Sequence, residues 1–200
     1  MKTITLSNEV MVSDPCYKVP TWCQHKLINV LPGEYQSTVV KFNDRYWGNR
    51  NSFIIVVHKD YNTEDKLNWR KLPFDIGVDS GQAGIFSMET YRNDEVFVSG
   101  SRKENDGEEW YEHMSNMTLD GERWGTYPNG IVSSSGIGDG GYELRVAKHK
   151  GKVVGVLLDF FMENLTGKHI EIFRKENMLG DVCGICGEDN VDSTSCNCKM

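Results

Sequence analysis

The chain has 200 residues, which is enough for one large domain or for one domain with a small appendage. Hydrophobic residues make up 38% of it, and no apolar run approaches the length of a membrane-spanning helix, so we expect no membrane insertion. The formal net charge of −7 argues against non-specific nucleic-acid binding, which requires lysine and arginine to neutralise phosphates.

The N-terminal sequence Met-Lys-Thr-Ile-Thr-Leu lacks the apolar run and the small-residue cleavage site of a secretory signal. We therefore expect the protein to act in the cytoplasm. In that reducing compartment, the six cysteines are expected to be thiols or metal ligands rather than disulfide partners.

Alternation of apolar and polar residues with a period of two dominates the chain and predicts β-strands. In chain order, the expected strands cover residues 35–42, 52–59, 95–100, 142–148, 152–161 and 169–173. The turn signal Lys150-Gly151 separates two of these strands and predicts a hairpin, with lysines at its solvated tip.

One helix is predicted over residues 106–119, with Asp106 as its N-cap and with Trp110, Met114 and Met117 on one face. A second, short helix is expected over residues 22–30. Many short strands and few helices indicate a mainly β fold, either an antiparallel sandwich or a distorted barrel. We expect a β-rich domain over residues 1–178 and a cysteine-rich tail over residues 179–200.

The tail carries a cysteine pattern typical of a small zinc knuckle. Cys183 and Cys186 form a C-x-x-C-G motif, and Cys196 and Cys198 supply two further thiolates. Four sulfur ligands fill the tetrahedral shell of zinc, so this site would be structural and would help the tail to fold. Two alternatives stay open, namely a disordered thiol-rich terminus and two redox-active cysteine pairs.

Four segments rich in glycine, serine and aspartate, at residues 13–17, 77–84, 133–142 and 157–160, are candidates for a ligand site. Glycines allow the backbone to approach a small ligand or cation, and carboxylates and hydroxyls supply polar contacts. The alternative is that the aspartates only stabilise turns and strand ends. The candidate ligand-binding residues are Asp14, Asp79, Ser80, Gln82, Asp139, Tyr142 and Asp159.

These segments also carry a family resemblance. The sequence V-D-S-G-Q-A-G at residues 78–84, S-S-G-x-G-D-G-x-Y at residues 134–142 and the D-F pair at residues 159–160 resemble the DUF4241 family of uncharacterised proteins. The S-D-P-C-Y sequence at residues 13–17 is similar to hypothetical proteins of tailed bacteriophages. The resemblance implies a phage origin and carries no established activity.

Two further motifs have simpler explanations. Residues 136–141 suggest a phosphate-binding loop, but they lead into a strand rather than a helix N-terminus, so we expect a tight glycine-rich loop. Cys16 could be a nucleophile with His25 as its base, although the neighbouring Pro15 favours a packed thiol.

The sequence is best interpreted as a non-enzymatic binding protein that acts on a host component, either a host protein or a small polar ligand. One alternative is a metal-dependent hydrolase that uses Asp79, Asp139 and Asp159, whose carboxyl groups would then share one pocket. The other alternative is a structural virion component, which would form a stable homo-oligomer.

Overall fold

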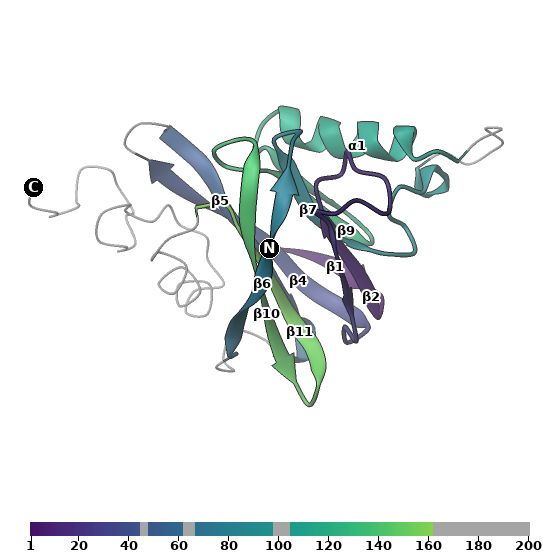
Figure 1. Cartoon of the computed structure of the whole chain (residues 1–200), viewed down its shortest axis with the longest axis vertical. Helices are drawn as coiled ribbons and strands as arrows, with labels where there is room; N and C mark the ends of the chain where they lie inside the picture. Colours follow the sequence, from purple (N-terminus) through teal and green to yellow (C-terminus); the bar gives the residue numbers. More distant parts are fainter. Residues whose placement is uncertain (45–47, 62–66, 98–104, 162–200) are drawn as a thin grey trace, which may run out of the picture.

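The computed structural model describes residues 1–44, 48–61, 67–97 and 105–161 (Figure 1). They form two antiparallel sheets, one of six strands in the order β1-β4-β5-β11-β10-β6 and one of five strands in the order β3-β2-β7-β9-β8. The six-stranded sheet comprises β1 (Lys2–Leu6), β4 (Gly33–Asp44), β5 (Gly48–His58), β6 (Trp69–Val78), β10 (Gly140–His149) and β11 (Lys152–Asp159). The five-stranded sheet comprises β2 (Glu9–Ser13), β3 (His25–Ile28), β7 (Gln82–Ser87), β8 (Trp124–Tyr127) and β9 (Gly130–Ser134).

The predicted mainly β, sandwich-like architecture is therefore confirmed. Its main core lies between the sheets, where Ile54 and Val56 of β5 pack with residues such as Ile85 of β7. The alternate residues of β5, Phe53 and Ile55, pack in a second cluster on the outer face of the six-stranded sheet. Because β5 is buried on both faces, its apolar residues form the nearly continuous run that made this strand recognisable in the sequence.

Helix α1 (Glu108–Leu119) covers the outer face of the five-stranded sheet (Figure 1). Trp110 and Met114 are fully buried against Phe86 and Val132, and Met117 packs at the edge of the same cluster. The predicted helix and its apolar face are thus confirmed. A buried aromatic or aliphatic side chain contributes about 1.5–3 kcal/mol to folding, so this face is sufficient to hold the helix on the sheet.

The helix begins differently from the prediction. Gly107 occupies the N-cap position with φ of 80°, and Asp106 instead accepts a hydrogen bond from the N–H of Glu108 (3.2 Å). The buried carboxylate of Asp94 accepts hydrogen bonds from the N–H groups of Gly107 (2.9 Å) and Trp110 (2.8 Å). A residue 13 positions before the N-cap therefore accepts hydrogen bonds from the N–H groups at the start of the helix.

Two predicted elements are wrong. Residues 22–30 contain no helix, because His25–Ile28 pairs with β2 as an edge strand. Residues Asp94–Val96 form a short 3-10 turn rather than the start of a strand. Asn93 caps this turn, and the Asp94 side chain accepts a hydrogen bond from the Trp110 N–H in the first turn of α1. Residues 98–100, the predicted strand at 169–173 and the cysteine tail lie outside the described residues.

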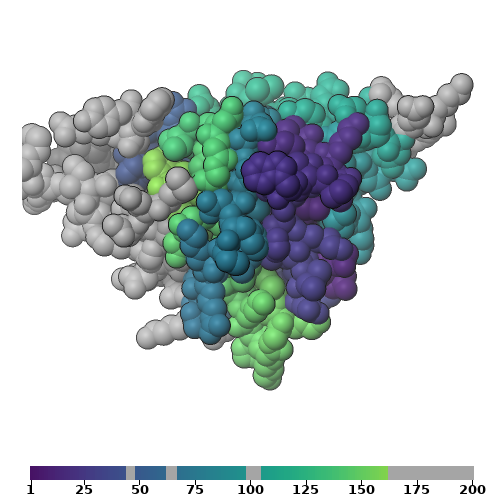
Figure 2. Space-filling view, in the orientation of Figure 1, coloured from purple at the N-terminus to yellow at the C-terminus, as the bar shows by residue number. Residues whose placement is uncertain are grey.

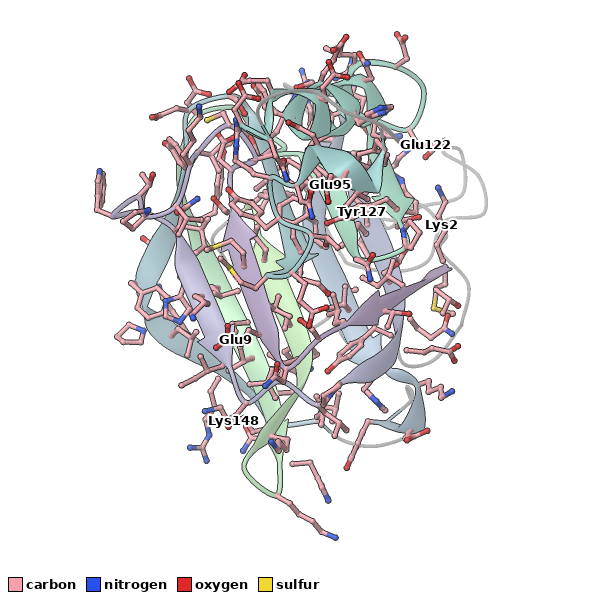
Figure 3. The ribbon with its side chains drawn as sticks, turned by 90° about the vertical axis from the view of Figure 1, so that its right-hand side faces the viewer. Lys2, Glu9, Glu95, Glu122, Tyr127 and Lys148 are labelled. Atoms are coloured by element: carbon pink, nitrogen blue, oxygen red, sulfur yellow. The ribbon has the colours of Figure 1, made fainter. Side chains whose placement is uncertain are left out.

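The hairpin between β10 and β11 is present, with Lys150 and Gly151 in its turn at φ of 45° and 80°. Its lysines are exposed, as expected for a solvated tip. Figure 3 shows Lys148 at the opposite end of the molecule from α1. Within the part of the chain that the structure describes, no helix combines the length and the apolarity needed to cross a bilayer.

Candidate functional site

The candidate loop segments of the sequence meet at one end of the sandwich, which we call the loop end. The Ser80 hydroxyl donates a hydrogen bond to the Asp14 carboxylate (2.7 Å), which joins the end of β2 to the β6–β7 turn. The Ser135 N–H donates to the Gly81 carbonyl (2.9 Å), which joins that turn to the β9–β10 connection. The loop end is defined here as residues 13–24, 79–81, 135–139 and 159–161.

The last of these segments is packed against the β9–β10 connection. A Cβ atom built on Gly136, whose φ is 65°, would lie 3.2 Å from the Cβ atom of Phe160 and 2.6 Å from the carbonyl oxygen of Asn51. A side chain at position 136 therefore has no space, and the left-handed backbone also favours glycine there. The glycine-rich loop is tight, as the sequence predicts, and leads directly into β10.

Asp14 is the central residue of the loop end. Its side chain is fully buried, and its Oδ1 atom accepts hydrogen bonds from the Cys16 N–H (2.8 Å) and the Ser80 hydroxyl. Its Oδ2 atom accepts from the N–H groups of Asp79 (2.9 Å) and Ser80 (2.7 Å). With four donors on two oxygens, this carboxylate holds the backbone together and has little capacity to act as a general base.

Tyr91 and Arg92 hold the loop that follows Asp14, and neither was singled out in the sequence. The Tyr91 hydroxyl lies 2.7 Å from the Tyr17 carbonyl oxygen and accepts a hydrogen bond from the Gln24 side chain (2.9 Å). The Arg92 guanidinium donates to the Pro15 carbonyl (3.0 Å). These contacts fix both ends of residues 15–24 against the segment after β7.

The same anchored loop exposes a large aromatic side chain. Trp22 is 94% exposed, and Val19 is 48% exposed. The turn between them is closed by hydrogen bonds from the Thr21 hydroxyl to the Lys18 carbonyl (2.6 Å) and from the Thr21 N–H to the Gln24 side chain (3.0 Å). On the face seen in Figure 2, the N-terminal residues in purple lie directly against the blue residues around β6.

Of the two described cysteines, Cys23 is buried and Cys16 is partly buried. Burial and the hydrogen bond to Asp14 raise the pKa of Cys16 to about 12, so the reactive thiolate is scarce at neutral pH. Cys23 is buried, and a Cβ atom on Gly77 would lie 2.6 Å from the Cys23 Cβ atom. His25 packs on the ring of Phe74, with ring centroids 4.0 Å apart. These contacts support the packed-thiol interpretation over a cysteine nucleophile.

The other candidate residues have separate partners. Asp79 is exposed, and its carboxylate accepts a hydrogen bond from the Tyr17 hydroxyl (2.6 Å), while burial and this bond raise the pKa of Tyr17. The Gln82 side chain donates to the Thr118 hydroxyl (2.8 Å) and so links β7 to α1. These two contacts stabilise the fold near the loop end rather than converge on one point.

Tyr142, Asp159 and Asp139 complete the candidate set. The Tyr142 hydroxyl donates to the Gly138 carbonyl (2.6 Å), and burial raises its pKa. Asp159 is buried and accepts a hydrogen bond from the Phe161 N–H (3.0 Å). Asp139 is exposed in the glycine-rich loop. The loop end therefore brings the candidate segments together, but most of their polar side chains form hydrogen bonds within the protein.

No three histidine, cysteine, aspartate or glutamate side chains among the described residues are grouped so that they could hold a metal ion. The hydrolase hypothesis, which requires Asp79, Asp139 and Asp159 in one pocket, gains no support from this geometry. The predicted zinc ligands Cys183, Cys186, Cys196 and Cys198 lie outside the described residues, so the zinc site stays a prediction.

Two adjoining clefts of about 220 and 290 Å³ open beside the glycine-rich loop. Both are lined by Arg50 at the start of β5, Arg123 just before β8, and Ser134 at the end of β9. No sequence pattern indicates this grouping, because the two arginines are far apart in the chain, one in β5 of the six-stranded sheet and one just before β8 of the five-stranded sheet. Figure 3 shows Glu122, which lines the smaller cleft, on the side of the molecule near α1.

Comparisons with known proteins do not add an identity to this geometry. The chain matches no protein-family model, and neither the curated proteins nor the solved structures contain a significant match. The resemblance to the DUF4241 family and the phage origin that it implies therefore stay predictions.

Proposed function

We propose that the chain is a non-enzymatic binding protein that uses the loop end to hold a protein partner, with Trp22 as the anchoring side chain. The observation that supports this proposal is an indole that is 94% exposed on a loop whose backbone is held by buried hydrogen bonds. If the chain is phage-encoded, as its resemblance implies, the partner is a host protein.

Physical reasons connect this feature to binding. A tryptophan side chain buries a large apolar area in an interface, and tryptophan is enriched among the residues that dominate binding energy. Because Asp14, Tyr91 and Arg92 already fix the loop, binding would cost little additional loop ordering. The net charge of −7 favours a partner with a basic surface around the pocket that receives the indole.

The polar groups of the loop end favour binding over catalysis. The Asp14 carboxylate is saturated by four donors, and the high pKa of Cys16 keeps its thiol protonated at neutral pH. Neither group is therefore available as a base or a nucleophile in this arrangement. The hydrolase remains an alternative without a specific observation in its favour.

The test is quantitative affinity capture from host cells with the tagged full chain, the Trp22→Ala variant and the Ile28→Ala variant. Ile28 is the matched control, since it is also an exposed apolar residue (58%) but lies on the edge strand β3. We expect a protein partner whose recovery falls at least tenfold with Trp22→Ala and is unchanged with Ile28→Ala, a loss typical of an anchoring tryptophan.

Binding of the purified partner to the same three proteins then measures the affinity directly. Because Trp22 makes little contact with the fold, its variant should melt at the wild-type temperature. Partners that bind both variants as well as the wild type would contradict the proposal. A stable homo-oligomer that Trp22→Ala dissociates would instead support the virion-component alternative.

A further inference from the structure

We propose that the larger of the two clefts binds the phosphate group of a small ligand. The cleft has a volume of about 290 Å³ and is lined by Arg50, Arg123, Ser134 and the glycine-rich loop from Ser135 to Gly138. This volume lies at the lower end of the range for ligand sites, so it suits a phosphate with a small attached group. The inference is independent of the proposed role of Trp22.

The charge of the cleft favours an anion. Two arginines line it, and none of the described residues that line it is acidic. Glu122 lines only the adjoining cleft, where it forms an ion pair with Lys41. A local positive charge in a chain with a net charge of −7 is therefore concentrated where the two sheets meet the glycine-rich loop.

Arg123 is the clearest ligand-binding candidate. Its backbone is fixed, because its N–H donates to Asp120 (3.0 Å) and its carbonyl accepts from the N–H of Ser134 (2.9 Å) and from the Asn51 side chain (3.0 Å). Its guanidinium makes no hydrogen bond or ion pair with any described residue. The structure thus holds the backbone of an arginine in place and leaves its charged group at the cleft.

Neutral donors surround the arginines. The Ser134 oxygen accepts a hydrogen bond from the Asn51 side chain (3.2 Å), which leaves the hydroxyl proton of Ser134 for another acceptor. The N–H groups of Gly136 and Gly138 have no hydrogen-bond acceptor in the described part of the chain. Both glycines have positive φ, a backbone conformation that is common in loops whose N–H groups bind anions.

The donor set explains why a phosphate fits better than a carboxylate. The Arg123 guanidinium, the Ser134 hydroxyl and two backbone amides already provide more donors than the two oxygens of a carboxylate can accept. A phosphate group presents three or more oxygens, and arginine binds phosphate in a bidentate geometry. The loop differs from a P-loop, because arginines from a strand and a turn replace the helix N-terminus.

The test uses the full chain labelled with ¹⁵N, titrated with inorganic phosphate at constant ionic strength and followed by amide NMR. Wild type, Arg50→Gln and Arg123→Gln are compared with Arg70→Gln as the matched control. Arg70 is an exposed arginine that pairs with Val146 of β10, near the β10–β11 hairpin turn. Acetate and glucose 6-phosphate are titrated in the same way.

We expect saturable shifts at Gly136 and Gly138, a dissociation constant at least tenfold higher in Arg50→Gln and Arg123→Gln, and no change in Arg70→Gln. Tighter binding of glucose 6-phosphate than of inorganic phosphate would assign the natural ligand to phosphate esters, and equal binding would assign it to free phosphate. Shifts that do not saturate, acetate binding as tight as phosphate binding, or wild-type affinity in Arg123→Gln would overturn the proposal. The Trp22→Ala variant should bind phosphate normally, which separates this test from that of the proposed function.

Discussion

The substitution Asp14→Asn tests whether the buried carboxylate is what holds the loop end together. In the wild type, Oδ2 accepts from the N–H groups of Asp79 (2.9 Å) and Ser80 (2.7 Å), and Oδ1 accepts from the Cys16 N–H (2.8 Å) and the Ser80 hydroxyl (2.7 Å). An asparagine replaces one of these oxygens with an NH₂ group, which cannot accept a hydrogen bond.

The less costly orientation places the NH₂ group where Oδ1 was. The Ser80 hydroxyl can then rotate and accept, so only the Cys16 N–H loses its partner, while the two remaining N–H groups bind a neutral oxygen instead of a charged one. A hydrogen bond to a charged group is worth about 1.5–3 kcal/mol, and an orphaned buried donor costs about 1–3 kcal/mol. We expect the free energy of unfolding to fall by about 2–4 kcal/mol.

Urea denaturation of the full chain, followed by far-UV circular dichroism, measures this loss. The matched control is Asp139→Asn, an aspartate exposed in the glycine-rich loop, which should change the free energy of unfolding by no more than about 0.5 kcal/mol. The m-value should stay constant, since the surface exposed on unfolding is unchanged. A loss below about 1 kcal/mol for Asp14→Asn, or an equal loss for both variants, would refute the reasoning.

Three further predictions follow from other residues. Burial opposes ionisation of Asp94, but hydrogen bonds from the N–H groups of Trp110 and Gly107 outweigh burial and lower its pKa. Its contribution to the free energy of unfolding should therefore be full above pH 3.8 and lost as the pH falls further. Urea unfolding at pH 7 and at pH 3 should show a smaller loss of stability between the two pH values in Asp94→Asn than in the wild type. Burial raises the pKa of Cys16 from the ordinary 9.0 to about 12, so its thiolate fraction at pH 7 should be roughly 1,000-fold smaller than that of an unperturbed thiol. Because a more basic thiolate is also a better nucleophile, iodoacetamide should modify Cys16 roughly 30-fold more slowly, as peptide mapping would show. A rate near that of glutathione would contradict the raised pKa. Purified protein should contain about one equivalent of zinc that is lost in the Cys183→Ser, Cys186→Ser double variant, and less than about half an equivalent in the wild type would refute the zinc site.

The sequence predicted the longer strands of the six-stranded sheet. The expected strands at 35–42, 52–59, 142–148 and 152–161 coincide with β4, β5, β10 and β11. Burial on two sides gives β5 and β11 long apolar runs, and burial on one side gives β10 an alternating pattern. Strand β6 was missed since it contains Pro73, which a central strand would exclude. It is an edge strand of its sheet, where a missing N–H is tolerated.

The short strands of the second sheet carried a weaker signal. The six residues of β7 include Ala83, Gly84 and two polar residues, and they are strand-like only because β2 and β9 pair with them on either side. A Cβ atom on Gly84 would lie 2.1 Å from the Phe86 ring, so the glycine is needed for packing rather than for a turn. Tertiary pairing of this kind cannot be seen in a single segment.

The candidate site was predictable where its chemistry lies in one short motif. Asp14 and Ser80 were both singled out from their own segments, and the structure joins them. Tyr91 and Arg92 could not be found in this way, because they act on carbonyl groups of a loop that is more than 70 residues earlier in the chain. Arg123 was also missed, since its place in a cleft depends on Arg50, which lies in the other sheet and far away in the chain.

The contacts of Asp14 also have a kinetic consequence. Ser80 is 66 residues away in sequence, and it lies in the turn where the chain passes from the six-stranded sheet to the five-stranded sheet. Strands β2 and β7 must pair before these hydrogen bonds can close. This pairing joins distant parts of the chain, so we expect the hydrogen bonds to be absent from the transition state for folding. A chevron plot of Asp14→Asn should then show faster unfolding with a nearly unchanged folding rate, which would make Asp14 a determinant of how long the native state persists.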